Sequence, residues 1–88
     1  MAHTKSAVKR ARTSETRRIA NRGVRGDVAA ARRSFLDATA GGDATKSGQQ
    51  FKAYCSALDK AAKKGVIATN NADRHKSRAA RRLAALSR

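Results

Sequence analysis

The stretch VRGDVAAARRSFLDA (residues 24–38) decides the fold, because its apolar side chains recur at helical spacing. They are separated by 4, 3, 4 and 3 residues, which places them along one face of an α-helix. The residues of this first seam are Val24, Val28, Ala31, Phe35 and Ala38. The spacing predicts a helix that buries this face against other helices.

Two more seams lie downstream at the same kind of spacing. The second seam consists of Phe51, Tyr54, Cys55, Leu58 and Ala62, and the thinner third one of Ala72, Ala79, Leu83 and Leu86. Val66 and Ile67 lie between them and are expected to cover the end of the bundle. Proline is absent and 20 of the 88 residues are alanine, so helix is favoured over long spans.

Two glycine-containing turns divide the chain into three helices. Gly41-Gly42-Asp43 predicts a helix end followed by an aspartate N-cap, and Lys64-Gly65 predicts a second helix end. Asn70 with Asp73 resembles a capping box at the start of the third helix. We therefore expect helices over 5–40, 44–64 and 70–87. Short connections favour antiparallel neighbours, which gives an all-α, up-down-up three-helix bundle.

The seam fades upstream of Val24, and the first helix becomes strongly basic there. We expect residues 1–23 to form an arm that projects from a bundle of residues 24–88, within a single domain of 1–88. Residues 1–26 contain eight cations and one acid, Glu15. On a helical wheel the cations fall on three faces: Lys5, Lys9 and Arg12; Arg10 and Arg17; Arg18, Arg22 and Arg25. The arm lacks a core of its own, so we expect it to become fully helical on a partner.

The charge of the whole chain identifies the class of partner. Twenty-one Lys and Arg against six Asp and Glu give a net charge of +15, which attracts polyanions. A helix lying on a membrane needs one apolar and one basic face, and this arm is basic nearly all round. No apolar run approaches the length of a membrane-spanning helix. We therefore expect a nucleic acid around the arm, and no membrane.

The residue inventory narrows the kind of nucleic-acid binding. Cys55 is the single cysteine, so no thiol-based zinc site or intrachain disulfide is expected. The aromatic residues lie at core spacing and no strands are predicted, so base stacking on a sheet is not expected. The six acids are scattered, which predicts neither an active site nor a bound metal or cofactor. Recognition of folded RNA by shape and phosphate position remains.

The candidate RNA-binding residues form two groups. The first comprises the eight cations of the first helix named above, with Ser6 as a phosphate ligand or a first-turn capping residue and Asn21 as a ribose or base contact or a residue that faces solvent. The second lies near the bundle and comprises Lys63, Lys64, Arg74, His75, Lys76, Arg78, Arg81 and Arg82. Gly23-Val24-Arg25-Gly26 matches a GxxG loop, although the fold that uses this loop requires strands.

Two blocks of sequence resemble the bacterial small ribosomal subunit protein S-twenty family. The first block contains Ala2, Lys5, Ser6, Ala7, Lys9, Arg10, Glu15, Arg17, Arg18, Asn21 and Arg22 at the family's positions. The second contains KAAKKGVI (residues 60–67) and then Asn70, Ala72, Arg74, Lys76, Ser77 and Arg78. The sequence departs from the family pattern mainly within residues 68–73. The resemblance covers essentially the whole chain.

The resemblance implies more than composition does. Proteins of this family are three-helix proteins that bind 16S ribosomal RNA in the small ribosomal subunit early in assembly and hold RNA helices together. The implied location is the cytoplasmic ribosome, and no small-molecule substrate or second copy of the chain is expected as a partner. The alternative from composition alone is a histone-like nucleoid protein that binds DNA, although the repeats and low-complexity tails usual in that class are missing.

Overall fold

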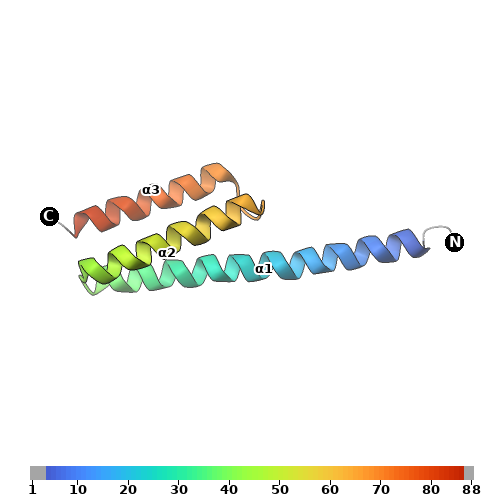
Figure 1. Ribbon diagram of the computed structural model, residues 1–88, viewed down its shortest axis with the longest axis horizontal. Helices are drawn as coiled ribbons and strands as arrows, with labels where there is room; N and C mark the ends of the chain where they lie inside the picture. The colour runs from blue at the N-terminus through green and yellow to red at the C-terminus, as the bar shows by residue number, and fades with distance from the viewer. Residues whose placement is uncertain (1–3, 87–88) are drawn as a thin grey trace.

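The computed structural model describes residues 4–86, which form three α-helices without strands. Helix α1 spans Thr4–Ala40, α2 spans Ala44–Lys63 and α3 spans Thr69–Ala85. They run up, down and up, with α1 much the longest (Figure 1). The predicted all-α class and long first helix are confirmed. The predicted end of the third helix at residue 87 lies outside the described residues.

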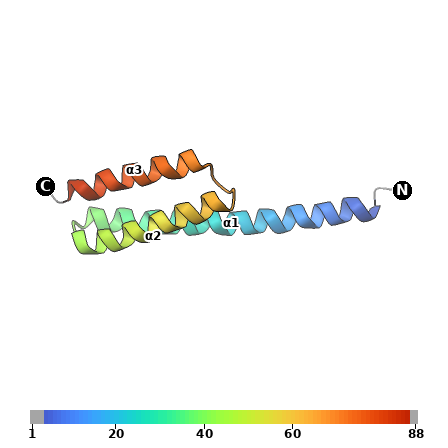
Figure 2. The same cartoon turned by 45° about the horizontal axis from the view of Figure 1, so that its top comes forward.

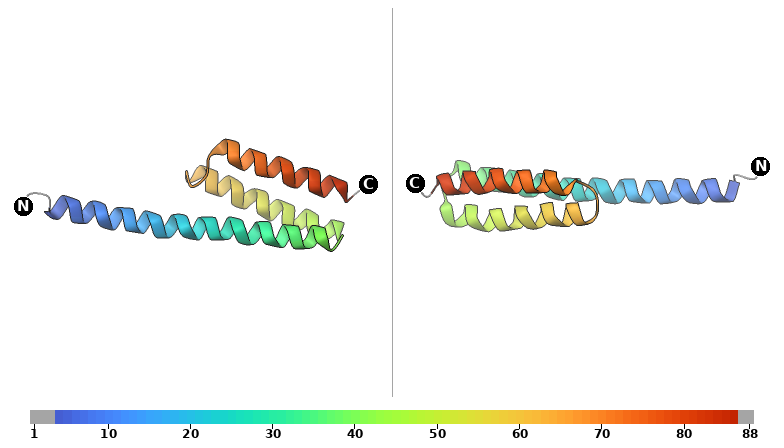
Figure 3. Two further views of the ribbon diagram at one scale, coloured as in Figure 1. Left: turned by 180° about the vertical axis from the view of Figure 1, so that it is seen from behind. Right: turned by 90° about the horizontal axis from the view of Figure 1, so that it is seen from above.

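Helix α2 occupies the centre of the packing. It packs against the second half of α1 on one side and against α3 on the other, whereas α1 and α3 have few direct contacts. Figure 2 shows that the first half of α1 extends well beyond the end of both shorter helices. The two views in Figure 3 show the same arrangement, with the bundle confined to one end of a molecule 67 Å long.

The core contains side chains from all three helices and matches the predicted seams closely. Its buried residues are Phe35, Tyr54, Leu58, Ala72 and Ala79. The ring of Phe35 is 6.0 Å from those of both Phe51 and Tyr54, centroid to centroid. These aromatic contacts join α1 to α2 at the middle of the bundle.

Three residues of the predicted seams lie at the edge of the core, namely Val24, Cys55 and Leu86. Cys55 is only half-buried and is not among the residues that pack on the central cluster, because the α2 face that meets α1 and α3 passes through Leu58 and Ala61 instead. Partial burial raises the pKa of its thiol. Ser47 and Thr39 are buried polar residues that the apolar pattern did not identify.

Both ends of α2 are formed by the residues that the sequence predicts. Asp43 caps α2, since its carboxylate Oδ1 accepts a hydrogen bond of 2.9 Å from the Lys46 amide. Gly65 ends the turn after α2 with φ of +75°, a conformation that glycine adopts without steric cost. The Val66 amide then bonds to the Ala61 carbonyl at 2.9 Å, as in a Schellman motif.

The predicted capping box at the start of the third helix is wrong. Helix α3 begins at Thr69 with Ala68 at the N-cap position, and no side chain caps it. Asp73 is already inside the helix, and its carboxylate lies 3.6 Å from the Lys76 ammonium instead. The helix begins one residue before Asn70, so the Asn70 side chain is past the position from which it would act as a cap.

The arm half of α1 is helical but unsupported by other parts of the protein. All side chains from residue 5 to residue 20 are exposed, including the large apolar ones of Val8 and Ile19, which are 48% and 61% exposed. Val8 and Ile19 are eleven residues apart, about three turns, and share a face that is roughly half a turn around the helix from the seam of the bundle. The seam that packs the bundle therefore does not continue into the arm.

Candidate nucleic-acid interface

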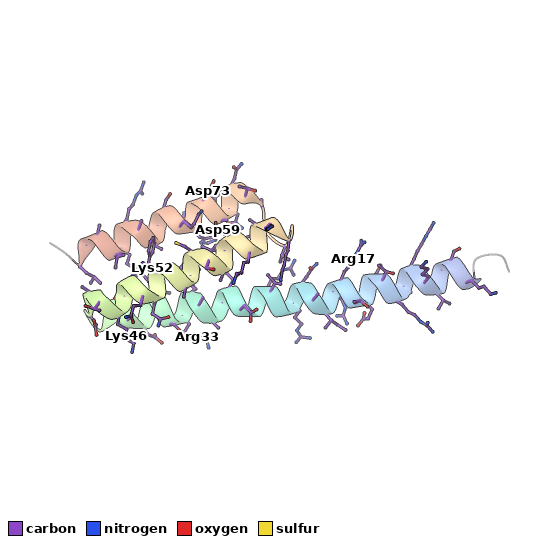
Figure 4. All side chains as sticks on the ribbon, viewed as in Figure 1. Arg17, Arg33, Lys46, Lys52, Asp59 and Asp73 are labelled. Carbon is purple, nitrogen blue, oxygen red and sulfur yellow. The ribbon has the colours of Figure 1, made fainter. Side chains whose placement is uncertain are left out.

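The first group of predicted site residues covers the arm on all sides. Figure 4 shows side chains leaving the first half of α1 in every direction, with Arg17 among them. At 3.6 residues per turn, its eight cations are spread around the circumference and along about 30 Å of helix. The geometry can place positive charge against several separate anionic strands at once.

Most of these cations form no ion pair within residues 4–86. Among the described residues, Arg18 alone in this group forms an ion pair, a two-point contact with Glu15 at 2.6 and 3.1 Å, and this hydrogen bond raises the pKa of Arg18. Nearby hydroxyls are also satisfied locally, since Thr13 and Thr16 donate to the carbonyls of Lys9 and Arg12. The charges of the seven other cations of the arm group are not compensated by an ion pair in the part of the chain that the structure describes.

The two uncharged candidates on α1 differ in their surroundings. Ser6 lies exposed in the first turn of the helix. Asn21 is half-buried where α1 approaches the bundle. Ser6 is therefore the more accessible of the two to an external ligand, while Asn21 lies at the junction between arm and bundle.

The second group of predicted residues is divided between two elements. Lys63 is in the last turn of α2 and Lys64 is its C-cap, where positive charge also favours the helix dipole. The α3 members are exposed except for His75 and Lys76, which are half-buried. This group lies on the bundle, and its Lys64 lines a pocket together with Val24 and Asp27 of α1, close to the base of the arm.

Lys76 differs from the other residues of this group because its ammonium group forms ion pairs with two carboxylates of the same chain. Its ammonium donates to the Asp59 carboxylate at 2.8 Å, which ties α3 to α2, and lies 3.6 Å from Asp73. The hydrogen bond with Asp59 is the main reason that the pKa of Lys76 is raised. Lys76 thus has a structural contact that the sequence pattern did not reveal.

One residue that the sequence analysis missed extends the second group onto α1. Arg32 lines a cavity between α1 and α3 together with His75, Arg78 and Arg82. The sequence signal was available, because Arg32 is three residues before Phe35 and so borders the buried seam. The predicted interface residues lie at the two ends of the chain and at Lys63 and Lys64, and Arg32 belongs to none of these clusters.

No group of three or more His, Cys, Asp and Glu side chains that could hold a metal ion occurs among residues 4–86. Within the same residues, no helix is both long and apolar enough to cross a membrane. The notable surface features are the exposed cations.

Comparison with known proteins identifies the family of the chain. The family model of ribosomal protein S20 matches residues 2–84. A small ribosomal subunit protein bS20 from Rhodococcus opacus is 47% identical over 77 residues, which cover 88% of this chain and 90% of the relative. The bS20 proteins of Mycolicibacterium gilvum and Salinispora tropica are 45% and 41% identical, covering 94% and 99% of this chain and 96% and 99% of theirs. The chain therefore belongs to the ribosomal protein S20 family, as its sequence resemblance predicted.

Proposed function

We propose that this chain binds 16S ribosomal RNA directly, through phosphate contacts of the arm and of the basic surface on the bundle, and bridges RNA helices during assembly of the small subunit. Its family makes it a structural protein of the small ribosomal subunit, in the cytoplasm as part of the ribosome, and not an enzyme. The direct RNA contacts and the bridging role are our proposal.

The observation that carries the proposal is the exposure of the arm on all sides. A solvated surface helix normally mixes charges of both signs, but here Glu15 is the single acid before Asp27. A helix of 37 residues is about 55 Å long, enough to contact more than one RNA duplex. Arginine predominates among the cations, 13 of the 21, and its guanidinium can bind two phosphate oxygens at once.

While α1 is helical throughout, the bundle sets the direction of the arm. The arm continues α1 without a break, and α1 is held in the bundle by Phe35, whose side chain is 1% exposed. The cations of the arm are therefore displayed at defined heights and angles relative to those of α3. A flexible basic tail would supply the same charge without this spacing.

The test is chemical footprinting of protein-free 16S RNA to which the full chain is added. We expect protection at two or more RNA helices that are distant in the RNA sequence, at about 0.2 M salt, where nonspecific binding is already weak. Duplex DNA of the same length as the RNA serves as the competitor. Equal competition by the DNA would contradict the proposal and favour a nucleoid protein.

Two matched double variants test whether the position of the removed charge matters or only the total charge. Arg10→Gln with Arg17→Gln removes two charges from the arm, and Arg33→Gln with Lys52→Gln removes two exposed charges from the bundle. We expect the first pair to lose protection at the RNA helix beside the arm and the second to change little. Equal losses would mean that only total charge matters.

A further inference from the structure

A cavity between α1 and α3 has a basic wall and an aromatic floor. Its volume is about 140 Å³, and Arg32, Arg78 and Arg82 line it together with His75. The ring of Tyr54, from α2, forms part of the floor and is buried. Four basic side chains from two helices thus converge on one small space.

Helical spacing explains the convergence. His75, Arg78 and Arg82 are separated by three and four residues, so they share a face of α3 beside the residues that pack on α2. Arg32 is on α1, one turn before Leu36, which also lines the cavity. Helices α1 and α3 both pack on α2 but have few direct contacts with each other, and the cavity occupies the space between them.

The charge in this cavity is not balanced by the protein. None of the lining side chains is acidic, and neither Arg32, Arg78 nor Arg82 forms an ion pair within residues 4–86. The opposite flank of α3 differs, because Lys76 there meets Asp59 and Asp73. Three guanidinium groups from two helices line this one cavity, and repulsion between their like charges opposes close approach of α3 to α1.

The floor of the cavity adds a neutral hydrogen-bond donor. Burial raises the pKa of Tyr54, and the nearby Arg32 opposes that shift only in part. The phenol therefore keeps its proton at neutral pH and its O–H can donate. Guanidinium groups combined with a hydroxyl donor suit a tetrahedral oxyanion, whose oxygens accept several hydrogen bonds at once.

We infer that the cavity between α1 and α3 binds one backbone phosphate of the bound RNA. Arg32 from α1 and Arg78 and Arg82 from α3 contact this phosphate. The anion replaces repulsion between the helices with attraction to a shared centre, so RNA holds α3 against α1. The inference rests on the proposed function for the identity of the ligand, but the anion site itself can be tested without RNA.

The first experiment titrates the full chain with inorganic phosphate, against chloride at equal ionic strength, while NMR follows the arginine Nε–H signals. We expect the signals of Arg32, Arg78 and Arg82 to shift together and to saturate. Those of Arg33 and Arg81, which are exposed and outside the cavity, should drift weakly without saturating. Equal, non-saturating shifts of all arginines would overturn the inference.

Variants give the second readout. Arg32→Gln should weaken phosphate binding by about three- to ten-fold, as expected for one charged hydrogen-bonding partner at a partly exposed site. Arg33→Gln is the neighbouring control and should leave it unchanged. Circular dichroism checks that both variants fold, and Arg82→Gln repeats the test from the other wall. Equal affinities in Arg32→Gln and Arg33→Gln would contradict the site.

The RNA experiment distinguishes this inference from the proposed function. Footprints of Arg32→Gln on 16S RNA should lose protection at one phosphate position that Arg33→Gln retains. Identical footprints of the two variants overturn the cavity site and leave the proposed function standing. Saturable phosphate binding without any protection of 16S RNA supports the anion site but overturns RNA as its occupant.

Discussion

The two halves of α1 belong to one unbroken helix but have different environments. From Val24 onward the helix has one face against α2, and Phe35 is 1% exposed. From residue 5 to residue 20 every side chain is exposed, and the charge is almost entirely positive. The same backbone geometry is thus supported by apolar burial in one half and, as we propose, by RNA in the other.

The difference shows that helix propensity and helix stability are separate properties. Both halves are rich in residues that favour helix, yet in proteins most helical stability comes from packing of an amphipathic face. The arm has no packed face, and its like charges repel one another. We therefore expect the arm of the free protein to exchange with unfolded conformations, which the bundle half does not do.

Removal of Phe35 should have the largest effect on this contrast. Phe35→Ala leaves a cavity between the aromatic rings of Phe51 and Tyr54, and we expect it to lower the free energy of unfolding by about 3–5 kcal/mol. The matched change in the arm, Ile19→Ala, should alter it by at most about 0.5 kcal/mol. Urea unfolding followed by circular dichroism measures both, and similar losses would show that the two halves are equally packed.

Amide hydrogen exchange tests the contrast along the helix itself. In the free protein we expect the amides of residues 8–20 to exchange at least about 100-fold faster than that of Leu58, because arm opening requires no loss of core contacts. Addition of 16S RNA should slow the arm amides. If the arm is already as protected as the core without RNA, its support is internal and our account of the arm is wrong.

A buried hydroxyl offers a smaller test on the bundle side. Ser47 is 0% exposed, and its Oγ has no hydrogen-bond partner within the described residues. Ser47→Ala removes an unsatisfied polar group, so we expect stabilisation by about 1 kcal/mol more than for the exposed control Ser56→Ala, which gains helix propensity alone. Thermal unfolding of the two variants decides, and equal gains would indicate that the hydroxyl has a partner in solution.

The smallest effect concerns one charge of the arm. Arg17→Ala should leave the free energy of unfolding nearly unchanged, because the residue is exposed. It should reduce the dependence of log affinity for 16S RNA on log salt concentration by slightly less than one unit, as expected for loss of one phosphate contact. Binding measured at four or more salt concentrations gives the slope, and an unchanged slope means that Arg17 does not contact a phosphate.

The sequence was sufficient for the parts of the fold that depend on periodicity and glycine. The seam through Phe35, the Asp43 cap and the turn at Gly65 are local patterns, and each appears in the structure as predicted. The start of α3 was not predicted correctly, because Asn70 and Asp73 match a capping box by spacing while the chain enters the helix one residue earlier. Spacing alone does not fix where the chain turns.

The candidate interface was predictable only where charge dominates. The arm cations follow directly from the charge pattern, but pairing across helices does not. That Lys76 would bond to Asp59, seventeen residues away, depends on how α3 is rotated on α2. The place of Arg32 beside Arg78 and Arg82 likewise depends on how far α3 lies from α1, which no local pattern encodes.

The position of Val8 and Ile19 bears on whether two copies of the free protein associate. A long helix with one continuous apolar stripe can dimerise by packing that stripe against the same stripe of a second copy, as in a coiled coil. In α1 the apolar residues move to the opposite face of the helix between Ile19 and Val24. A second copy packed on the apolar face of one half would therefore meet charged residues along the other half. We therefore expect the free protein to stay monomeric.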